Sequence, residues 1–252
     1  MLVSENQKNN ITAGGVKKTT NLIVIMGPPG CGKGTQAKLL QEKITGFKHI
    51  STGNLFRAEI RSGSELGKKV EDIMSSGKLV SDEITDKIFI SQTDKILAEE
   101  APNFILLDGY PRKVSQAKTF LEFCAQRIPL IGIPMVLEIQ VSEQEVIKRL
   151  AGRLTNPRTG KIYHEVFNPP KVPMICDEDG GELIKRKDDH PDTISSRYNI
   201  FKEARDGMMS VLTESIPLVK INGQQDPSEI ATEIKKIILE NFKHNIPKEI
   251  NI

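Results

Sequence analysis

Short apolar runs alternate along the chain with longer segments in which apolar residues recur at helical spacing. The apolar runs lie at 22–26, 104–107, 135–141 and 217–221, and each is short enough to be a strand. The first run, LIVIM, is apolar at every position, as in parallel strands that helices cover on both faces. Helical spacing predicts helices over 35–44, 82–99, 114–127, 192–213 and 227–242. Ser142 and Glu145 form a capping box that predicts a further helix ending at Leu150.

This alternation predicts an α/β fold. We expect a doubly wound parallel sheet of about five strands, with ligands at the carboxyl ends of the strands. The rhythm breaks between 152 and 189, where the sequence is rich in Pro, Gly and charge and contains short alternating pieces such as KIYHEVF. We interpret this stretch as a small β-rich lobe inserted into the sheet domain.

Residues 27–36, GPPGCGKGTQ, follow the first predicted strand in a pattern that is typical of a phosphate-binding loop (P-loop). Glycines at 27, 30, 32 and 34 allow successive backbone N–H groups to turn towards phosphate oxygens, and Lys33 adds a positive charge. Gly34 stands where the general pattern has Ser or Thr, and the hydroxyl comes one residue later at Thr35, which leaves metal binding by the loop open. A glycine-rich turn without a ligand is the alternative, and the number of matching positions disfavours it.

Asp108 follows the second apolar run and opens the motif DGYPR, which presents an acid and Arg112 at the end of a buried strand. A carboxylate at that place is suited to hold, through water, a Mg²⁺ that bridges nucleotide phosphates. The alternative is a turn-capping Asp beside Gly109, with Arg112 as an ordinary surface residue.

Further arginines stand in suggestive places. STGNLFR at 51–57 puts small polar residues at a predicted helix start and Arg57 about one turn later, which suits an anion. Capping of that helix by Ser51 or Thr52 is the better interpretation when the motif is taken alone. Arginines at 149, 153, 186 and 197 stand near the two ends of the inserted lobe, and guanidinium groups bind phosphate through paired hydrogen bonds. Each of these arginines taken singly would be interpreted as a solvated surface residue.

Composition narrows the range of partners and compartments. The 252 residues include 35 basic and 33 acidic side chains, so the net charge of +2 favours neither nucleic acid nor an anionic membrane as a partner. The three cysteines are far apart, which fits free thiols in a reducing compartment such as the cytoplasm. No apolar run approaches the roughly 18 residues of a membrane span, and residues 1–20 lack the apolar region of a secretory signal. Glu5 and the absence of Arg from that stretch disfavour a mitochondrial presequence.

Six motifs carry a family resemblance: GPPGCGKGTQ, STGNLFR, GKLVSDE, DGYPR, GRLTNPRTGKIYHEVFNPPK and RKDD. In this order they resemble the adenylate kinase family in its long-lid form, over about residues 21–243, and the lid is most similar to that of eukaryotic members. The resemblance implies a core domain made of 21–50, 81–151 and 190–243. It also implies a helical lobe for the nucleoside monophosphate at 51–80, a lid at 152–189, a flexible leader at 1–20 and a tail at 244–252.

The resemblance also implies a reaction and a set of site residues. The reaction is the reversible transfer of the γ-phosphoryl group of MgATP to AMP, giving two ADP, by a monomer. The ATP side would comprise Gly30, Cys31, Gly32, Lys33, Gly34, Thr35, Arg149, Arg153, Ile162, Tyr163 and Gln225. The AMP side would comprise Thr52, Arg57, Lys78, Leu79, Val80, Gly109, Tyr110, Pro111, Arg112, Gln116, Arg186 and Arg197. Lys33, Arg112, Arg153, Arg186 and Arg197 would act on the transferring phosphoryl group, and Asp108 would hold the Mg²⁺ through water.

Two features depart from the family pattern. Asn54 replaces the usual Asp after STG, and we expect a small effect because Asn also caps helices well. The lid positions that hold a structural zinc in many members are Asn156, Thr159, Cys176 and Asp179 here. One soft ligand is too few for a stable zinc site, so we expect a hydrogen-bonded polar cluster and no zinc.

Two alternative functions stay open at this point. The sequence around Gln225 matches the family less closely, so the donor base is weakly determined, and a GTP:AMP phosphotransferase or another nucleoside monophosphate kinase of the same fold is possible. A P-loop nucleotide switch is the more distant alternative. Such proteins typically carry a base-reading N-K-x-D motif, and the chain contains none.

Overall fold

The computed structural model describes residues 19–243, so the predicted tail and all but two residues of the predicted leader lie outside it. Thr20, the last residue of that leader, is held through both its backbone and its side chain. Its N–H donates to Leu130 O at 2.9 Å and its hydroxyl donates to Pro102 O at 2.7 Å. Within the described residues, no helix is both long and apolar enough to cross a membrane.

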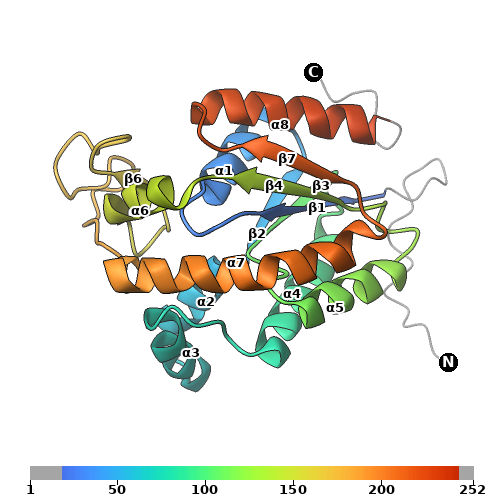
Figure 1. Ribbon diagram of the computed structural model, residues 1–252, viewed down its shortest axis with the longest axis horizontal. Coiled ribbons are helices and arrows are strands. Elements are labelled where there is room, and N and C mark those ends of the chain that lie inside the picture. The colour runs from blue at the N-terminus through green and yellow to red at the C-terminus, as the bar shows by residue number, and fades with distance from the viewer. Residues whose placement is uncertain (1–18, 244–252) are drawn as a thin grey trace.

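Five parallel strands form the central sheet of the described part, in the order β2-β3-β1-β4-β7 (Figure 1). They are β1 (Asn21–Met26), β2 (Phe47–Ser51), β3 (Phe104–Asp108), β4 (Met135–Gln140) and β7 (Leu218–Asn222). Strands β2 and β3 lie on one side of β1, whereas β4 and β7 lie on the other. The strand order therefore reverses at β1, and the predicted doubly wound parallel sheet is confirmed.

Strand β2 has no counterpart among the apolar runs of the sequence. Its five residues, FKHIS, include Lys48 and His49, which are both half-buried, so no continuous apolar stretch marks it. It is an edge strand that pairs only with β3, and an edge strand can keep polar side chains. The pairing sets Ser51 opposite Asp108, which brings the STGNLFR motif to the carboxyl end of β3.

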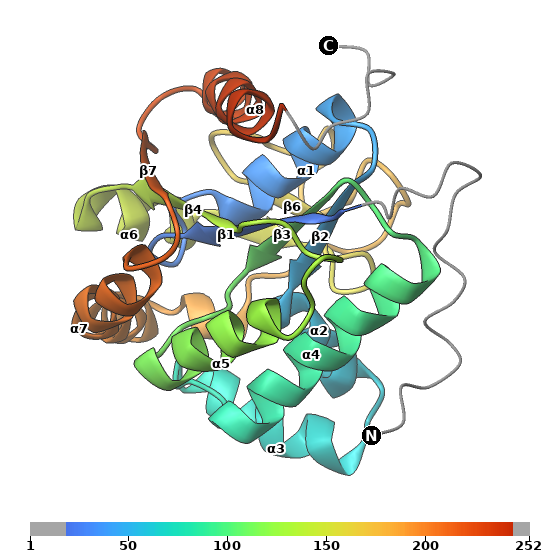
Figure 2. The same cartoon turned by 90° about the vertical axis from the view of Figure 1, so that its right-hand side faces the viewer.

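Helices cover both faces of the sheet (Figure 2). On one face lie α1 (Lys33–Lys43) and α8 (Pro227–Phe242), and on the other lie α4 (Asp82–Glu99), α5 (Val114–Ala125) and α7 (Pro191–Thr213). Successive residues of β1 face opposite sides: Val24 joins the core beneath α5 and α7, and Ile25 joins the core beneath α1 and α8. This explains why every position of LIVIM is apolar.

Two excursions from the sheet have small cores of their own. The first contains α2 (Thr52–Arg61) and α3 (Glu65–Ser75), which enclose Phe56, Val70 and Val80. The second follows α6 (Glu143–Ala151) and contains the antiparallel pair β5 (Arg153–Thr155) and β6 (Ile162–His164) and the short helix η2 (Lys187–Asp189). Its core is Leu154, Tyr163, Cys176 and Leu183. We call the two excursions, 51–80 and 152–189, the small lobe and the lid.

Candidate functional site

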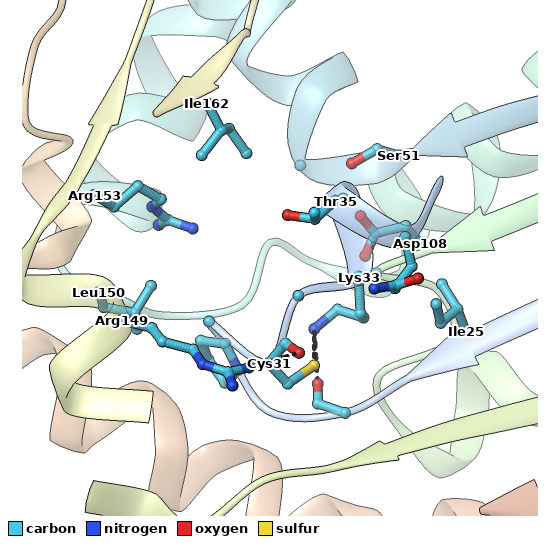
Figure 3. Close-up of a pocket in the computed structure, with 18 of the residues that line it drawn as sticks. Ile25, Cys31, Lys33, Thr35, Ser51, Asp108, Arg149, Leu150, Arg153 and Ile162 are labelled. Atoms are coloured by element: carbon cyan, nitrogen blue, oxygen red, sulfur yellow. Dashed lines mark hydrogen bonds between the residues drawn. The ribbon is translucent and has the colours of Figure 1, made fainter. Parts of the chain in front are cut away.

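A cleft of about 1220 Å³ lies at the carboxyl ends of the strands. The glycine-rich loop forms one wall, and the small lobe, the turn after β3 and the lid form the others. Figure 3 shows Lys33 on the loop side, with Arg153 and Ile162 of the lid pointing into the same space. Segments that are far apart in the sequence therefore share one site, at the place that the fold class predicts.

The glycine-rich loop owes its shape to its backbone. Gly27 has φ of 145°, and a Cβ there would lie 2.6 Å from Ile139 O, so no other residue fits. Gly32 caps α1 with φ of 106°, and α1 begins at Lys33, two residues before the predicted start. The N-terminus of α1 and its free N–H groups therefore face the cleft, where they favour an anion. Lys33 Nζ donates to Gly27 O at 2.8 Å and to Pro28 O at 2.9 Å, which folds its side chain back over the loop.

Asp108 is the last residue of β3 and faces the loop from the side. Its side chain is only 14% exposed, and its Oδ2 lies 3.5 Å from His49 Nε2. Burial alone would raise the pKa of Asp108, but the neighbouring His49 and the positive charges of Lys33 and Arg112 lower it to about 2. The group is therefore a carboxylate at neutral pH.

Five arginines face one another across the cleft. They are Arg57 of α2, Arg112 of the turn after β3, Arg153 of β5, Arg186 beside η2 and Arg197 of α7, and we call them the arginine cluster. Two acids of the RKDD motif, Asp188 and Asp189, pair with two of these arginines. Arg153 Nε donates to Asp189 at 2.7 Å, and Arg197 Nη1 lies 2.7 Å from Asp188 and 3.3 Å from Asp189.

Like charges are crowded in the arginine cluster, an arrangement that suits a bound anion. Burial and then the charges of Arg153 and Arg57 lower the pKa of Arg186 to about 8. Burial is also the main cause that lowers the pKa of Arg57 to about 10. Burial, followed by the charge of Arg197, lowers the pKa of Arg112. A multiply charged anion between these groups would remove the repulsion among them.

Most of the residues predicted for the site line the cleft. They are Gly30, Cys31, Gly32, Lys33, Gly34, Thr35, Arg57, Leu79, Asp108, Gly109, Pro111, Arg112, Arg149, Arg153, Ile162, Tyr163, Arg186, Arg197 and Gln225. Five predicted residues do not line it, namely Thr52, Lys78, Val80, Tyr110 and Gln116. Lys78 is exposed, and the other four are buried beside the cleft or in the small-lobe core.

The capping interpretation of STGNLFR is confirmed, and it is compatible with an anion at Arg57, which stays a prediction. Ser51 caps α2 by accepting the N–H of Asn54 at 3.4 Å, while Arg57 lines the cleft one turn later. Sequence reasoning assigned no role to His49, Asp188 or Asp189. The two aspartates were visible in RKDD next to Arg186, whereas His49 lies in the strand that no pattern revealed.

The expected polar cluster in the lid is confirmed. Asn156 is buried and donates to Asp179 Oδ1 at 2.7 Å, and its own oxygen accepts the N–H groups of Arg158 at 2.8 Å and Thr159 at 3.3 Å. Cys176 is buried beside Tyr163, whose hydroxyl lies 3.7 Å from the sulfur. Among residues 19–243 no group of three or more His, Cys, Asp or Glu is placed to hold a metal. That the lid takes no zinc stays a prediction.

Comparison with known proteins gives consistent matches. The sequence pattern of the family described as Adenylate kinase matches residues 25–215. A protein named Adenylate kinase from Listeria innocua is 40% identical over 218 residues, which cover 86% of this chain and 98% of that protein. A protein of the same name from Methanothrix thermoacetophila is 39% identical over 216 residues, covering 86% and 97%. Another from Thermosipho africanus is 39% identical over 216 residues, covering 86% and 98%.

Proposed function

The chain belongs to the adenylate kinase family and is an ATP:AMP phosphotransferase, and from that premise we propose how its cleft performs the transfer. ATP binds between the glycine-rich loop and the lid, and AMP binds between the small lobe and the turn after β3. The observation that carries this arrangement is the arginine cluster, which faces Lys33 within a single cleft. The phosphoryl group passes from ATP to AMP between them.

On the ATP side, the backbone from Gly30 to Thr35 surrounds the phosphates, and Lys33 contacts the β- and γ-phosphates. Arg149 supports this side because it donates to Gly223 O at 2.9 Å, which holds its guanidinium between the loop and the segment of Gln225. Ile162 lies over the loop, within van der Waals reach of Gly34. These residues and the backbone at Gln225 enclose the base. Tyr163 belongs to the lid core, so it contributes through its backbone.

On the AMP side, Arg57 and Arg112 bind the phosphate. The base lies against the small lobe and the turn, where the 78–80 backbone and residues Gly109 to Pro111 surround it, while the buried Thr52 and Gln116 support these segments from behind. The hydroxyl of Thr52 donates to Gly109 O at 2.8 Å, which supports this assignment because it joins the lobe to the turn. Arg186 and Arg197 lie between the two nucleotides and, with Arg153, neutralise the transferring group.

A Mg²⁺ that enters with ATP fits the residues near the loop. Asp108 offers one ionised carboxylate, and oxygen is the ligand that Mg²⁺ prefers. Among the described residues no group of three or more His, Cys, Asp or Glu forms a protein cage for a metal, which suits an ion that phosphate oxygens and water would mainly hold and that Asp108 would contact through water. When bound, the ion supplies neutralisation of phosphate charge.

The remaining work of this site is positioning and exclusion of water. In-line phosphoryl transfer needs aligned groups and charge neutralisation, so no nucleophilic Ser, Cys or His is required. Closure of the lid, of the kind that adenylate kinases show, keeps water from the γ-phosphate. Two contacts support such closure here: Lys38 of α1 pairs with Glu178 of the lid at 3.3 Å, and Lys187 pairs with Glu71 of the small lobe at 2.9 Å.

The assembly and compartment follow from simpler considerations. One chain supplies the residues proposed for both nucleotides, which supports a monomer as the active form. Cys31, Cys124 and Cys176 are free thiols and buried, which supports a reducing compartment, and we place the enzyme in the cytoplasm.

Initial rates with each pair of nucleoside triphosphate and monophosphate test the proposal. We expect ATP with AMP to give two ADP faster than any other pair, with a requirement for Mg²⁺. Absence of ADP from this pair would refute the function. A faster rate with GTP as donor would favour the GTP:AMP alternative, and hydrolysis without AMP that exceeds transfer would favour a nucleotide switch.

A further inference from the structure

The turn that carries Arg112 is tied to the first residue of α4, Asp82. The N–H of Arg112 donates to Gln116 Oε1 at 2.8 Å, and Gln116 Nε2 donates to Asp82 Oδ1 at 2.9 Å. Lys113, the next residue of the turn, reaches the same carboxylate oxygen directly at 2.8 Å. Ser115 donates to the other oxygen at 2.7 Å. The carboxylate of Asp82 therefore holds the turn directly, through Lys113, and indirectly, through Gln116. We call the indirect connection, Asp82 to Gln116 to Arg112, the relay.

The relay has only one consistent orientation. A backbone N–H can only donate, so the atom of Gln116 that faces Arg112 must be its oxygen. Burial alone would raise the pKa of Asp82, but the contacts with Lys113, Ser115 and Gln116 lower it, so this carboxylate accepts only. The amide nitrogen of Gln116 must therefore face Asp82. Gln116 is 1% exposed, so its amide is shielded from water, whereas the Asp82 side chain is 33% exposed.

Asp82 stands at the junction between the small lobe and the sheet domain. Val80, two residues earlier, packs in the small-lobe core, and Ser81 precedes the first turn of α4. On the other side of the relay, Arg112 lines the cleft, and its Nε donates to Gly109 O at 2.8 Å. The relay thus connects the base of the small lobe to a cluster arginine.

We propose that Asp82 is a positioning residue for the AMP side of the reaction: through Gln116 it fixes the backbone of Arg112, and so it sets where that guanidinium meets the phosphate of AMP. This rests on the proposed function, which assigns Arg112 to AMP. Asp82 touches neither nucleotide, so its effect appears in the binding of AMP and leaves the binding of ATP unchanged. The negative charge of Asp82 also stabilises the N-terminus of α4, which affects the stability of the fold and not the binding of AMP.

Alanine substitution with a matched control separates the two contributions. Asp82→Ala should raise the KM for AMP about tenfold, the factor that corresponds to losing one hydrogen bond to a charged group, with the KM for ATP unchanged. Asp94 is the control, because it joins the same two helices at their far end, where it receives two bonds from Arg127 at 2.6 and 2.7 Å. Asp94→Ala should lower Tm and leave both KM values as they are.

Asp82→Asn provides the rescue. Its carbonyl can still accept from Gln116 and Lys113 while its amide donates to Ser115, so the KM for AMP should return close to that of the parent although the charge is lost. Asp82→Ser keeps a polar first turn, but its side chain is too short to reach Gln116. If the alanine variant fails to fold, Asp82→Ser replaces it in the test and should raise the KM for AMP in the same way.

Three outcomes would overturn the proposal. They are an unchanged KM for AMP in Asp82→Ala and Asp82→Ser, an equal rise in both KM values, and a rise in Asp94→Ala as large as in Asp82→Ala. A parent enzyme that makes no ADP from ATP and AMP would instead refute the proposed function. The parent rate therefore tells the two failures apart.

Discussion

The glycine-rich loop and the arginine cluster face the same cleft, but they are built in different ways. The loop is ten consecutive residues whose shape depends on backbone angles, as at Gly27 and Gly32, and β1 in the buried sheet anchors it. The cluster is five side chains from elements that lie between residues 57 and 197, three of them in the small lobe or the lid. The loop is therefore organised before any ligand binds. The geometry of the cluster depends instead on the positions of the small lobe and the lid relative to the sheet domain.

Electrostatics sharpens the contrast. The loop attracts phosphate with N–H groups and one lysine, whose partners are two neutral carbonyl oxygens and the sulfur of Cys31. The cluster concentrates like charges, which Asp188 and Asp189 offset in part through ion pairs, with a further contribution from the carboxylate of Asp108. Repulsion among these arginines opposes the approach of the small lobe and the lid. When nucleotide phosphates lie between them, the net interaction becomes attractive. Since a ligand shifts a conformational equilibrium by its differential affinity, the phosphates should favour the state in which the arginines meet.

Removing the charge of the loop should have the largest effect. Lys33→Met should lower the rate of ADP formation by a factor on the order of thousands, because it removes a positive charge from the transition state. Folding should be intact, since the partners of Lys33 are two backbone oxygens, which water can satisfy, and the sulfur of Cys31, which accepts hydrogen bonds only weakly. Lys43→Met, on the exposed end of the same helix, is the control for both the rate and Tm. Near-normal turnover in Lys33→Met would contradict the assignment of the loop.

Removing one member of the cluster should have a smaller and one-sided effect. Arg57→Ala should raise the KM for AMP by about ten- to a hundredfold, the cost of losing charged hydrogen bonds, while the KM for ATP stays unchanged. Arg61→Ala, one turn further along α2 and exposed, should change neither value. If Arg57→Ala raised only the KM for ATP, the two nucleotide sides would be reversed.

The same contrast explains what the sequence could reveal. Because the loop is local, its glycine spacing and the apolar run before it were enough to predict its place and ligand class. The alternation of strands and helices predicted the sheet, because its buried strands are mainly apolar, although β4 also carries the buried Glu138. Strand β2 was not predicted, because an edge strand tolerates Lys48 and His49 and so shows no apolar run. The contact of His49 with Asp108 was therefore not predicted either.

The meeting of the arginines could not be predicted from spacing. Nothing local distinguishes Arg57 or Arg197 from a surface arginine, and only family resemblance brought them together before the fold was known. Even that resemblance did not indicate which acids would pair with them, or that Gln116 would be buried in a relay to Asp82. Such contacts depend on tertiary packing between distant segments.

The unusual residue of the AMP side should matter little. Asn54 Oδ1 accepts a bond from Arg57 Nη2 at 2.6 Å, and a carboxylate at this position could accept the same bond. Asn54→Asp should therefore leave turnover within several-fold of the parent in the ATP plus AMP assay. Asn54→Ala, which removes the acceptor, should instead raise the KM for AMP. A loss of about a hundredfold in Asn54→Asp would mean that the charge disturbs the cluster through Arg57.

Zinc chelation tests the lid, the lobe that carries Arg153 and Arg186. We expect it to have no effect. In the lid, Asn156 joins Asp179 and two backbone N–H groups by hydrogen bonds, and these need no ion. Incubation with a zinc chelator, followed by its removal and return of Mg²⁺, should leave Tm and activity unchanged. Asn156→Ala should lower Tm, since it leaves buried polar groups unpaired, and it checks that the measurement senses the lid. Metal analysis that finds one tightly held zinc per chain would show that the cluster is a metal site, and that the lid has a rigid anchor like the loop.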